Sequence, residues 1–306
     1  MRIVFLGTPD FAVAALDALV QHGKNVVAVV TAPDKPAGRG MNLQQSAVKK
    51  YAVEHQIPVL QPEKLKNEEF LTALASYKAD VQVVVAFRML PEVVWNMPPL
   101  GTINIHASLL PNYRGAAPIN WAIINGEKES GVTTFKLKHE IDTGNILLQR
   151  KLQIGEDENA GSLHDRLMYA GAELIIETLD QLEQGSLVEQ AQLPNIDSKH
   201  APKLFTETCE IHWHKTTDEV YNLIRGLSPY PAAYTILNGK KLKIFSANKV
   251  TNETLALPGT IQTNNKSFLR YACLDGFIEL LEIQPEGKKR MPVADYLRGN
   301  KIDLRC

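Results

Sequence analysis

The sequence has few cysteines and no apolar run long enough to cross a membrane. Its three cysteines, Cys209, Cys273 and Cys306, lie far apart among 306 residues, so we expect no disulfide framework and a reducing, cytoplasmic location. The apolar stretch at residues 81–87 is far shorter than the roughly 20 residues that span a bilayer. Polar residues interrupt the apolar N-terminus at 8–10, and we interpret it as a core strand rather than a signal peptide. No membrane partner is expected.

Motifs for nucleotide-dependent and zinc-dependent chemistry are also missing. The sequence contains no P-loop, no HExxH and no paired CxxC. The turn after the first predicted strand, Gly7-Thr8-Pro9, lacks the second and third glycines of a dinucleotide-binding loop, so no NAD is expected. Thr8 is instead predicted to cap the next helix, with Pro9 at its first position.

One stretch contains candidate metal ligands. Cys209, His212 and His214 are closely spaced, and cysteine and histidine are common zinc ligands. A fourth ligand at a partnered spacing is missing, and strand alternation puts Cys209 on one face with Ile211 and Trp213. We therefore predict that this stretch is structural and that the protein holds no metal.

Charge is distributed unevenly, although the net charge is only −1. Residues 199–306 carry 16 Lys and Arg against 11 Asp and Glu, whereas residues 1–198 carry 17 against 23. A basic C-terminal third is typical of a domain that binds a polyanion. On charge alone, a solvated surface with a chance asymmetry is an equally good interpretation.

The first half of the chain alternates short β-branched runs with stretches of helical spacing. This pattern predicts βαβ units, and hence an α/β fold with an open parallel sheet and helices on both faces. The predicted strands are residues 2–6, 25–31, 80–87, 101–105 and 131–138, and the predicted helices are residues 10–22, 46–55, 67–76 and 161–184.

The pattern changes near the C-terminus. Short strands are separated there by turn signals such as Asn238-Gly239, which predicts a small antiparallel barrel with one helix packed on it. The predicted strands are residues 233–237, 241–247, 268–273 and 276–284, and the predicted helix is residues 218–227. A polar, proline-containing stretch precedes this region. We therefore expect a first domain at residues 1–190, a linker at 191–208 and a second domain at 209–306.

Two polar residues lie at the carboxyl end of one of the predicted buried strands. Asn104 and His106 are two residues apart, so their side chains emerge on one face, at the carboxyl end where open α/β sheets place their active sites. An amide and an imidazole side by side can polarise a carbonyl group and move a proton. Asp142, in an Asp-Thr-Gly turn, would orient the imidazole if the sheet brings the two together. The alternatives are two incidental polar residues and an acid that only closes its turn.

Taken together, these motifs resemble the folate-dependent formyltransferases. The resemblance rests on the sequence HASLLP from His106, the following Tyr113-Arg114-Gly115 and the later Asp-Thr-Gly at Asp142, in this order. It implies a Rossmann-like formyltransferase fold, with 10-formyltetrahydrofolate as co-substrate, tetrahydrofolate as product, and neither metal nor NAD. It also implies that Asn104, His106 and Asp142 are the catalytic residues.

The resemblance further implies a folate pocket shaped by two short segments. The implied residues are Phe87, Arg88, Met89, Leu90, Ser108, Leu109, Leu110 and Pro111. The sequence departs from the family's pattern at Ala107, where Gly is common, and at Phe87-Arg88-Met89, which replaces a usual Tyr-Gly-Leu.

Three features resemble the members of this family that act on methionyl-tRNA. They are the PDKPAGRG loop at residues 33–40, the opening GTPDFA at residues 7–12, and a basic C-terminal region of OB-like type that contains GKKRM at residues 287–291. The resemblance implies transfer of formyl to the α-amino group of initiator methionyl-tRNA, giving N-formylmethionyl-tRNA for translation initiation. The implied tRNA contacts are Arg39, Lys288, Lys289 and Arg290, and we expect a monomer.

Two kinds of alternative remain open. Within the family, the formyl acceptor could be glycinamide ribonucleotide, a nucleotide sugar or water. An enzyme of purine synthesis, which would act on the first of these, needs neither the basic C-terminal region nor the loop at residues 33–40, so both features count against it. Outside enzymes, the chain could be an RNA-binding scaffold with an OB-like module, which would leave the Asn–His–Asp trio idle.

Arg39 provides a sharp test of the tRNA-directed interpretation. Its loop, residues 33–40, holds two prolines and two glycines, so we expect no regular element and an exposed arginine. We predict that Arg39→Ala leaves folate binding intact but sharply lowers formyl transfer to methionyl-tRNA. Arg39→Lys should rescue transfer only in part, because an ammonium lacks the planar fork of donors of a guanidinium. Equal kcat/KM for wild type and Arg39→Ala on charged tRNA would show that the loop is only a spacer.

Overall fold

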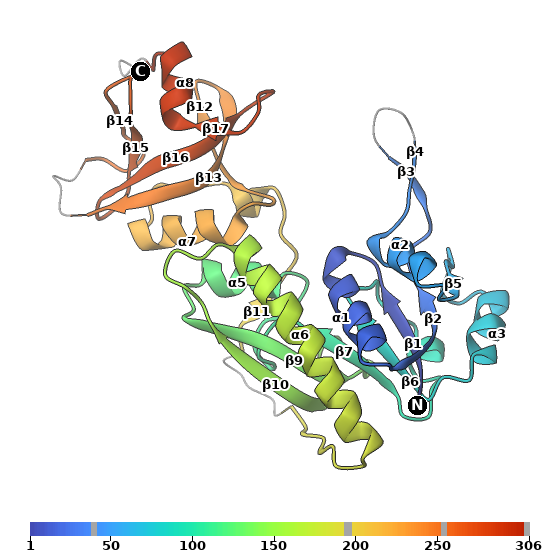
Figure 1. Cartoon of the computed structure of the whole chain (residues 1–306). Coiled ribbons are helices and arrows are strands. Elements are labelled where there is room, and N and C mark those ends of the chain that lie inside the picture. The colour runs from blue at the N-terminus through green and yellow to red at the C-terminus, as the bar shows by residue number, and fades with distance from the viewer. Residues whose placement is uncertain (38–41, 193–197, 252–255, 303–306) are drawn as a thin grey trace. The chain divides into compact units, whose positions relative to one another are not determined.

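The structure, a computed structural model, describes residues 1–37, 42–192, 198–251 and 256–302 (Figure 1). The chain forms two compact units that are discontinuous in sequence. The N-terminal unit comprises residues 1–115, 130–152 and 165–199, and the C-terminal unit comprises residues 116–129, 153–164 and 200–306.

A seven-stranded sheet forms the centre of the N-terminal unit. In spatial order its strands are β10 (Ile146–Gln153), β9 (Glu129–Lys136), β7 (Thr102–His106), β6 (Val81–Val85), β1 (Arg2–Gly7), β2 (Asn25–Val30) and β5 (Val59–Leu60). The five strands from β7 to β5 are parallel, as predicted. Strand β9 runs antiparallel to β7, so the sheet is mixed, a detail that the sequence pattern did not indicate. Hydrophobic patterning reports which residues are buried, and it does not report strand direction.

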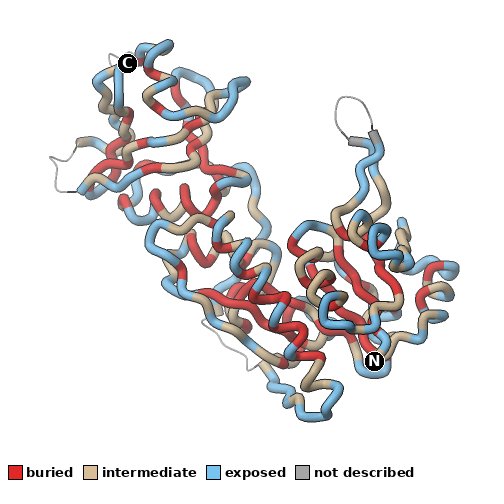
Figure 2. The backbone as a smooth tube through the Cα atoms, in the orientation of Figure 1, coloured by how far each residue is buried: buried red, intermediate tan, exposed pale blue. Residues whose placement is uncertain are grey.

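Helices cover both faces of this sheet, as predicted. They are α1 (Asp10–Gln21), α2 (Ala47–Glu54), α3 (Glu68–Ser76), α4 (Glu92–Trp95) and α6 (Ala160–Glu183). On one face, Phe70 of α3 packs in a buried cluster with Leu6 of β1. On the other face, a Cβ at Gly171 of α6 would lie 3.0 Å from Ile105 of β7, so this helix and strand are in close contact. The strands are accordingly the most deeply buried part of the unit (Figure 2).

Two local predictions in this unit are wrong. The N-cap of α1 is Pro9 and no side chain caps it, so Thr8 does not cap this helix. The loop predicted to be irregular contains a short ribbon in which β3 (Lys35–Ala37) pairs antiparallel with β4 (Asn42–Gln44). Pro36 is compatible with this ribbon because both of its strands are edge strands, the position in a sheet to which proline is largely confined.

A curled antiparallel sheet forms the C-terminal unit, which confirms the predicted OB-like domain. In spatial order the strands are β12 (Ala233–Leu237), β13 (Lys240–Val250), β16 (Phe277–Pro285), β15 (Leu269–Ala272) and β14 (Ile261–Thr263), and β17 (Met291–Pro292) pairs with β16. Asn238 and Gly239 both have positive φ, as the predicted hairpin turn requires. Register shifts around Ser246 in β13 add the local bend of β-bulges. The apolar face of α7 (Thr217–Leu227) packs into the core of this sheet.

Segments from the middle of the chain also belong to the C-terminal unit. Helix α5 (Pro118–Ile124) contacts α7 through a hydrogen bond of 2.8 Å from the Asn120 side-chain amide to the Gly226 carbonyl. The Arg225 guanidinium donates to the Glu158 carbonyl at 2.9 Å. The remaining elements are β8 (Arg114–Gly115), β11 (His200–Ala201), a 3-10 helix at Glu207–Cys209 and α8 (Val293–Gly299). The domain boundaries proposed at residues 190 and 208 stay a prediction.

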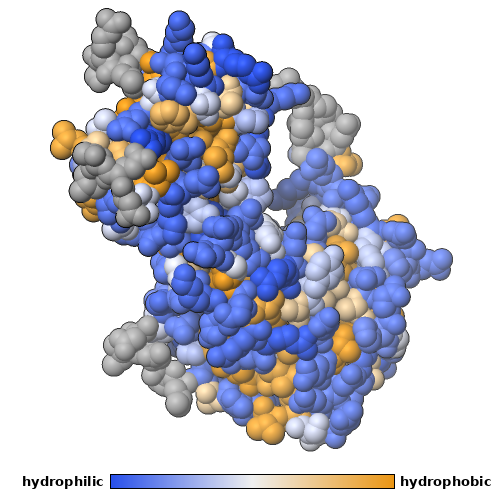
Figure 3. All heavy atoms as spheres, turned by 60° about the vertical axis from the view of Figure 1, so that its left-hand side comes forward, coloured by the Kyte–Doolittle hydropathy of each residue, from blue (hydrophilic) through white to orange (hydrophobic). Residues whose placement is uncertain are grey.

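The face of the molecule drawn in Figure 3 is largely hydrophilic, with hydrophobic residues in patches between polar ones. Within the described residues, no helix is both long and apolar enough to span a bilayer.

Candidate functional site

The candidate site lies where strand β7 ends, within the N-terminal unit. Side chains alternate along this strand, so Asn104 and His106 share one face while Ile103 and Ile105 share the other. Ile105 faces α6. The two polar residues therefore share a face, as the sequence predicted, and this face is on the side of the sheet opposite to α6.

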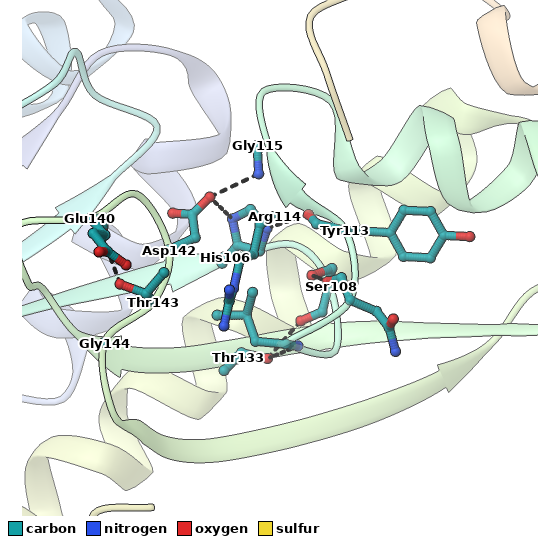
Figure 4. A network of polar contacts seen from close by, with 12 residues as sticks. His106, Ser108, Tyr113, Arg114, Gly115, Thr133, Glu140, Asp142, Thr143 and Gly144 are labelled. Atoms are coloured by element: carbon teal, nitrogen blue, oxygen red, sulfur yellow. Dashed lines mark hydrogen bonds and ion pairs between the residues drawn. The ribbon is translucent and has the colours of Figure 1, made fainter. Parts of the chain in front are cut away.

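His106 is held between a backbone carbonyl and a carboxylate (Figure 4). Its Nε2 is 2.8 Å from the Tyr113 carbonyl oxygen, and its Nδ1 is 3.8 Å from Oδ2 of Asp142. A carbonyl oxygen can only accept a hydrogen bond, so Nε2 carries the proton of the neutral ring and Nδ1 carries the lone pair. His106 is 7% exposed and Asp142 is 9% exposed, so little water screens the charge between them.

Asp142 reaches the imidazole from an unusual backbone conformation. Its φ is 55°, in the left-handed region, and its Oδ2 accepts a hydrogen bond of 2.9 Å from the Gly115 backbone N–H. The turn lies flush against β9, because a Cβ at Gly144 would be 1.5 Å from the Lys136 carbonyl oxygen. Only glycine fits there. The carboxylate is thus aimed by its own backbone and by a donor from the Tyr113-Arg114-Gly115 motif.

The Asn104 side chain offers the site an unused amide. It is partly buried, and it makes no hydrogen bond to any of the residues that the structure describes. A half-buried amide without a protein partner is available to a ligand or to water.

The turn after β7 is tightly tied to β9. The Ser108 hydroxyl donates to the Asn112 carbonyl at 2.6 Å, and the Thr133 hydroxyl donates to the Ser108 carbonyl at 2.6 Å. The backbone N–H of Leu110 donates in turn to the Thr133 hydroxyl at 3.2 Å. Ser108 is fully buried, so its side chain shapes the turn from within, while Leu109 and Pro111 are partly exposed.

The second segment predicted to shape the pocket follows strand β6. Ala86 has a φ of 46°, and Met89 is 75% exposed, whereas Leu90 is buried. Arg88 bridges to the loop after β5, where it donates to the Pro62 carbonyl and, at 2.8 Å, to the Glu63 carbonyl. Its guanidinium carbon lies 5.8 Å from the centre of the Phe87 ring.

The predicted tRNA contacts lie apart from this site in sequence. Lys288, Lys289 and Arg290 are exposed at the turn that follows β16. Arg290 pairs with Glu282 and covers the ring of Phe245 at 4.3 Å, while neither lysine forms an ion pair with a described residue. Arg39 falls outside the described residues.

The stretch that contains candidate metal ligands has the predicted strand-like alternation. Cys209, Ile211 and Trp213 are buried, whereas His212 and His214 are exposed. Among the described residues, no group of three or more His, Cys, Asp or Glu side chains is arranged to hold a metal ion.

Several residues that build the site were missed by reasoning from the sequence. Tyr113 and Gly115 act through backbone atoms, and only the motif that contains them signals their position. Thr133 and Gln192 act through side chains, and their partners lie far away in sequence. No local pattern marks such residues.

Comparisons with known proteins agree on one family. Residues 1–179 match the family described as formyl transferase, and residues 203–301 match its C-terminal domain. A methionyl-tRNA formyltransferase of Bacteroides fragilis is 54% identical to this chain, over 98% of the chain and 95% of that protein. One from Flavobacterium johnsoniae is 52% identical, over 98% of the chain and 96% of that protein.

Similar solved structures are more distant in sequence. The sugar 3N-formyl transferase WlaRD has a TM-score of 0.70 at 21% identity, over 94% of this chain and 99% of that chain. HypX from Aquifex aeolicus, solved in complex with tetrahydrofolic acid, has a TM-score of 0.66 at 20% identity. The match covers 97% of this chain but only 47% of HypX. At this identity the likeness concerns the fold.

Proposed function

Because this chain belongs to the formyl transferase family, we propose that it transfers the formyl group of 10-formyltetrahydrofolate to the α-amino group of initiator methionyl-tRNA. The products are tetrahydrofolate and N-formylmethionyl-tRNA, which serves translation initiation. The observation that carries this proposal is identity above 50%, over nearly the whole length of both chains, to proteins named methionyl-tRNA formyltransferase. The sugar formyl transferase WlaRD and HypX share only the fold with this chain, at 21% and 20% identity. Their similarity is therefore weaker evidence about the acceptor than the similarity to the methionyl-tRNA formyltransferases.

His106 is the proposed proton acceptor. The attacking amine must give up a proton as its nitrogen bonds to the formyl carbon. Nδ1 of His106 is the ring nitrogen with the free lone pair, because Nε2 donates to the Tyr113 carbonyl. The Asp142 carboxylate, 3.8 Å from Nδ1, attracts the positive charge that the ring acquires. The carboxylate of a Ser-His-Asp triad likewise stabilises an imidazolium, although it faces the ring nitrogen that already carries a proton.

Asn104 is the proposed oxyanion donor. Attack on the formyl carbon gives a tetrahedral intermediate with negative charge on its oxygen. A preorganised amide lowers the barrier by donating to that oxygen, and the Asn104 side chain has no competing partner among the described residues. The protonated His106 adds a second stabilising charge. Collapse of the intermediate then expels the folate nitrogen, which takes up a proton.

The C-terminal unit is the proposed binding surface for the tRNA backbone. Lys288 and Lys289 are exposed without ion-pair partners in the described part of the chain, so their charges are available to phosphates. Arg290 is held by Glu282 and Phe245, and its planar group is thereby presented in a fixed orientation. Arg39 is the proposed contact from the first unit.

Substitution of the trio tests the proposed chemistry. Formyl transfer from 10-formyltetrahydrofolate is measured with methionyl-tRNA, uncharged tRNA and a nucleotide amino sugar as acceptors. We expect wild-type protein to formylate only methionyl-tRNA. His106→Ala and Asp142→Asn should fold normally and lose about 10²–10⁴-fold in kcat, the range for a positioned acid or base. Asn104→Ala should lose about 10²–10³-fold, as for a lost oxyanion donor.

A matched control for the trio is His55→Ala, which removes an exposed histidine at the end of α2 and should leave kcat unchanged. Near-native kcat for any variant of the trio at saturating substrates would refute that residue's role. Efficient transfer to the amino sugar instead of methionyl-tRNA would refute the proposed acceptor.

Neutralising the lysine pair tests the proposed tRNA surface. We expect the double variant Lys288→Ala/Lys289→Ala to bind tRNA more weakly, with the slope of log K against log salt reduced by about 0.9 or less for each lost phosphate contact. Folate affinity should not change, and Lys66→Ala, an exposed lysine of the N-terminal unit, serves as the control for lost surface charge. A salt slope equal to that of wild type would show that these lysines are only solvated.

A further inference from the structure

Gln192 links the turn that carries Asp142 to the motif that holds His106. Its side-chain amide nitrogen donates to the Asp142 carbonyl at 2.9 Å and to the Gly144 carbonyl at 2.7 Å. Its side-chain oxygen accepts from Arg114, at 3.1 Å from Nε and 2.5 Å from Nη2. All the hydrogen-bonding capacity of one amide is therefore used between these two segments.

These bonds act on a backbone that needs support. Asp142 has a left-handed φ of 55°, which is unfavourable for a residue with a side chain. One amide group fixes both the carbonyl of Asp142 itself and that of Gly144, two residues further along the same turn. The oxygen of the same amide accepts hydrogen bonds from Arg114, which is next to Gly115 in the chain. The Gly115 N–H donates to the Asp142 carboxylate. Gln192 thus fixes both the backbone that aims the carboxylate and a donor that orients it.

The segment that carries Gln192 is itself anchored. Gln190 and Ile146 exchange two backbone hydrogen bonds of 2.8 Å, which sets the register. Glu189 binds Lys136 at 2.5 Å and accepts from Asn145 at 2.9 Å. The hydrogen bond from Lys136 lowers the pKa of Glu189 below its ordinary value, as expected of a carboxylate that stays charged in this pair. A side chain held this firmly can impose geometry on the turn it contacts.

We infer that Gln192 is a positioning residue for formyl transfer, one that acts by holding the Asp142 carboxylate in line with Nδ1 of His106. The inference rests on the proposed function and on the role given there to Asp142. It assigns a part in the reaction to a residue of the stretch that the sequence presents as a linker. Gln192 itself need not touch either substrate.

A double-mutant cycle with Asp142 tests this inference in the full-length protein. We expect Gln192→Ala to lower kcat on the order of tenfold to a hundredfold with little change in KM for either substrate, because a carboxylate displaced by a fraction of an ångström loses its effect. In the Asp142→Asn background the same substitution should cost almost nothing more, since its effect passes through that carboxylate. Gln190→Ala is the matched control, because this neighbouring glutamine is exposed and its side chain bonds to no described residue.

Gln192→Glu separates positioning from a merely structural link. A glutamate keeps an acceptor for Arg114 but puts an oxygen against the two carbonyls, so we expect it to be as defective in kcat as the alanine variant. If the Tm shows that Gln192→Ala is unfolded, Gln192→Glu is used for the test in its place. Near-native kcat for Gln192→Glu, or additive losses in the cycle, would overturn the inference. An Asp142→Asn protein with native kcat would instead refute the role proposed for Asp142. A wild-type protein that does not formylate methionyl-tRNA would refute the proposed function, so these failures are distinguishable.

Discussion

The approach of the Asp142 carboxylate to Nδ1 of His106 is the interaction on which the rest of the site depends. The Tyr113 carbonyl accepts from Nε2, and this hydrogen bond leaves the other ring nitrogen facing the acid. The carboxylate arrives from a turn with a left-handed φ, packed so closely on β9 that residue 144 must be glycine. Each of these elements is a constraint on backbone geometry, and together they leave one imidazole nitrogen free to take a proton.

The roles proposed for the two units agree with the distribution of charge along the chain. The site residues belong to the N-terminal unit, whose mixed sheet fixes them at the end of β7. The C-terminal unit is a curled antiparallel sheet that carries exposed basic residues at the turn after β16. A rigid sheet suits chemistry that tolerates little displacement, whereas a cationic surface suits a large polyanion whose phosphates give orientation and affinity.

Sequence reasoning predicted the elements that local patterns specify. The buried parallel strands, the helices between them, the hairpin at Asn238 and the shared face of Asn104 and His106 all follow from periodicity and turn chemistry. The antiparallel direction of β9 and the ribbon of β3 and β4 do not, because direction and pairing are set by contacts between distant segments. For the same reason, the roles of Thr133 and Gln192 could not be predicted from the sequence, because their hydrogen-bond partners are distant in the chain and close only in the folded protein.

The most direct test of this account is the tautomer of His106, measured by ¹⁵N NMR on protein with labelled histidine. His106→Gln identifies the signal by its loss. We expect the neutral ring to carry its proton on Nε2 and to leave Nδ1 unprotonated, facing Asp142. A neutral ring protonated on Nδ1 would contradict it, because Nδ1 would then have no lone pair with which to accept the proton of the attacking amine.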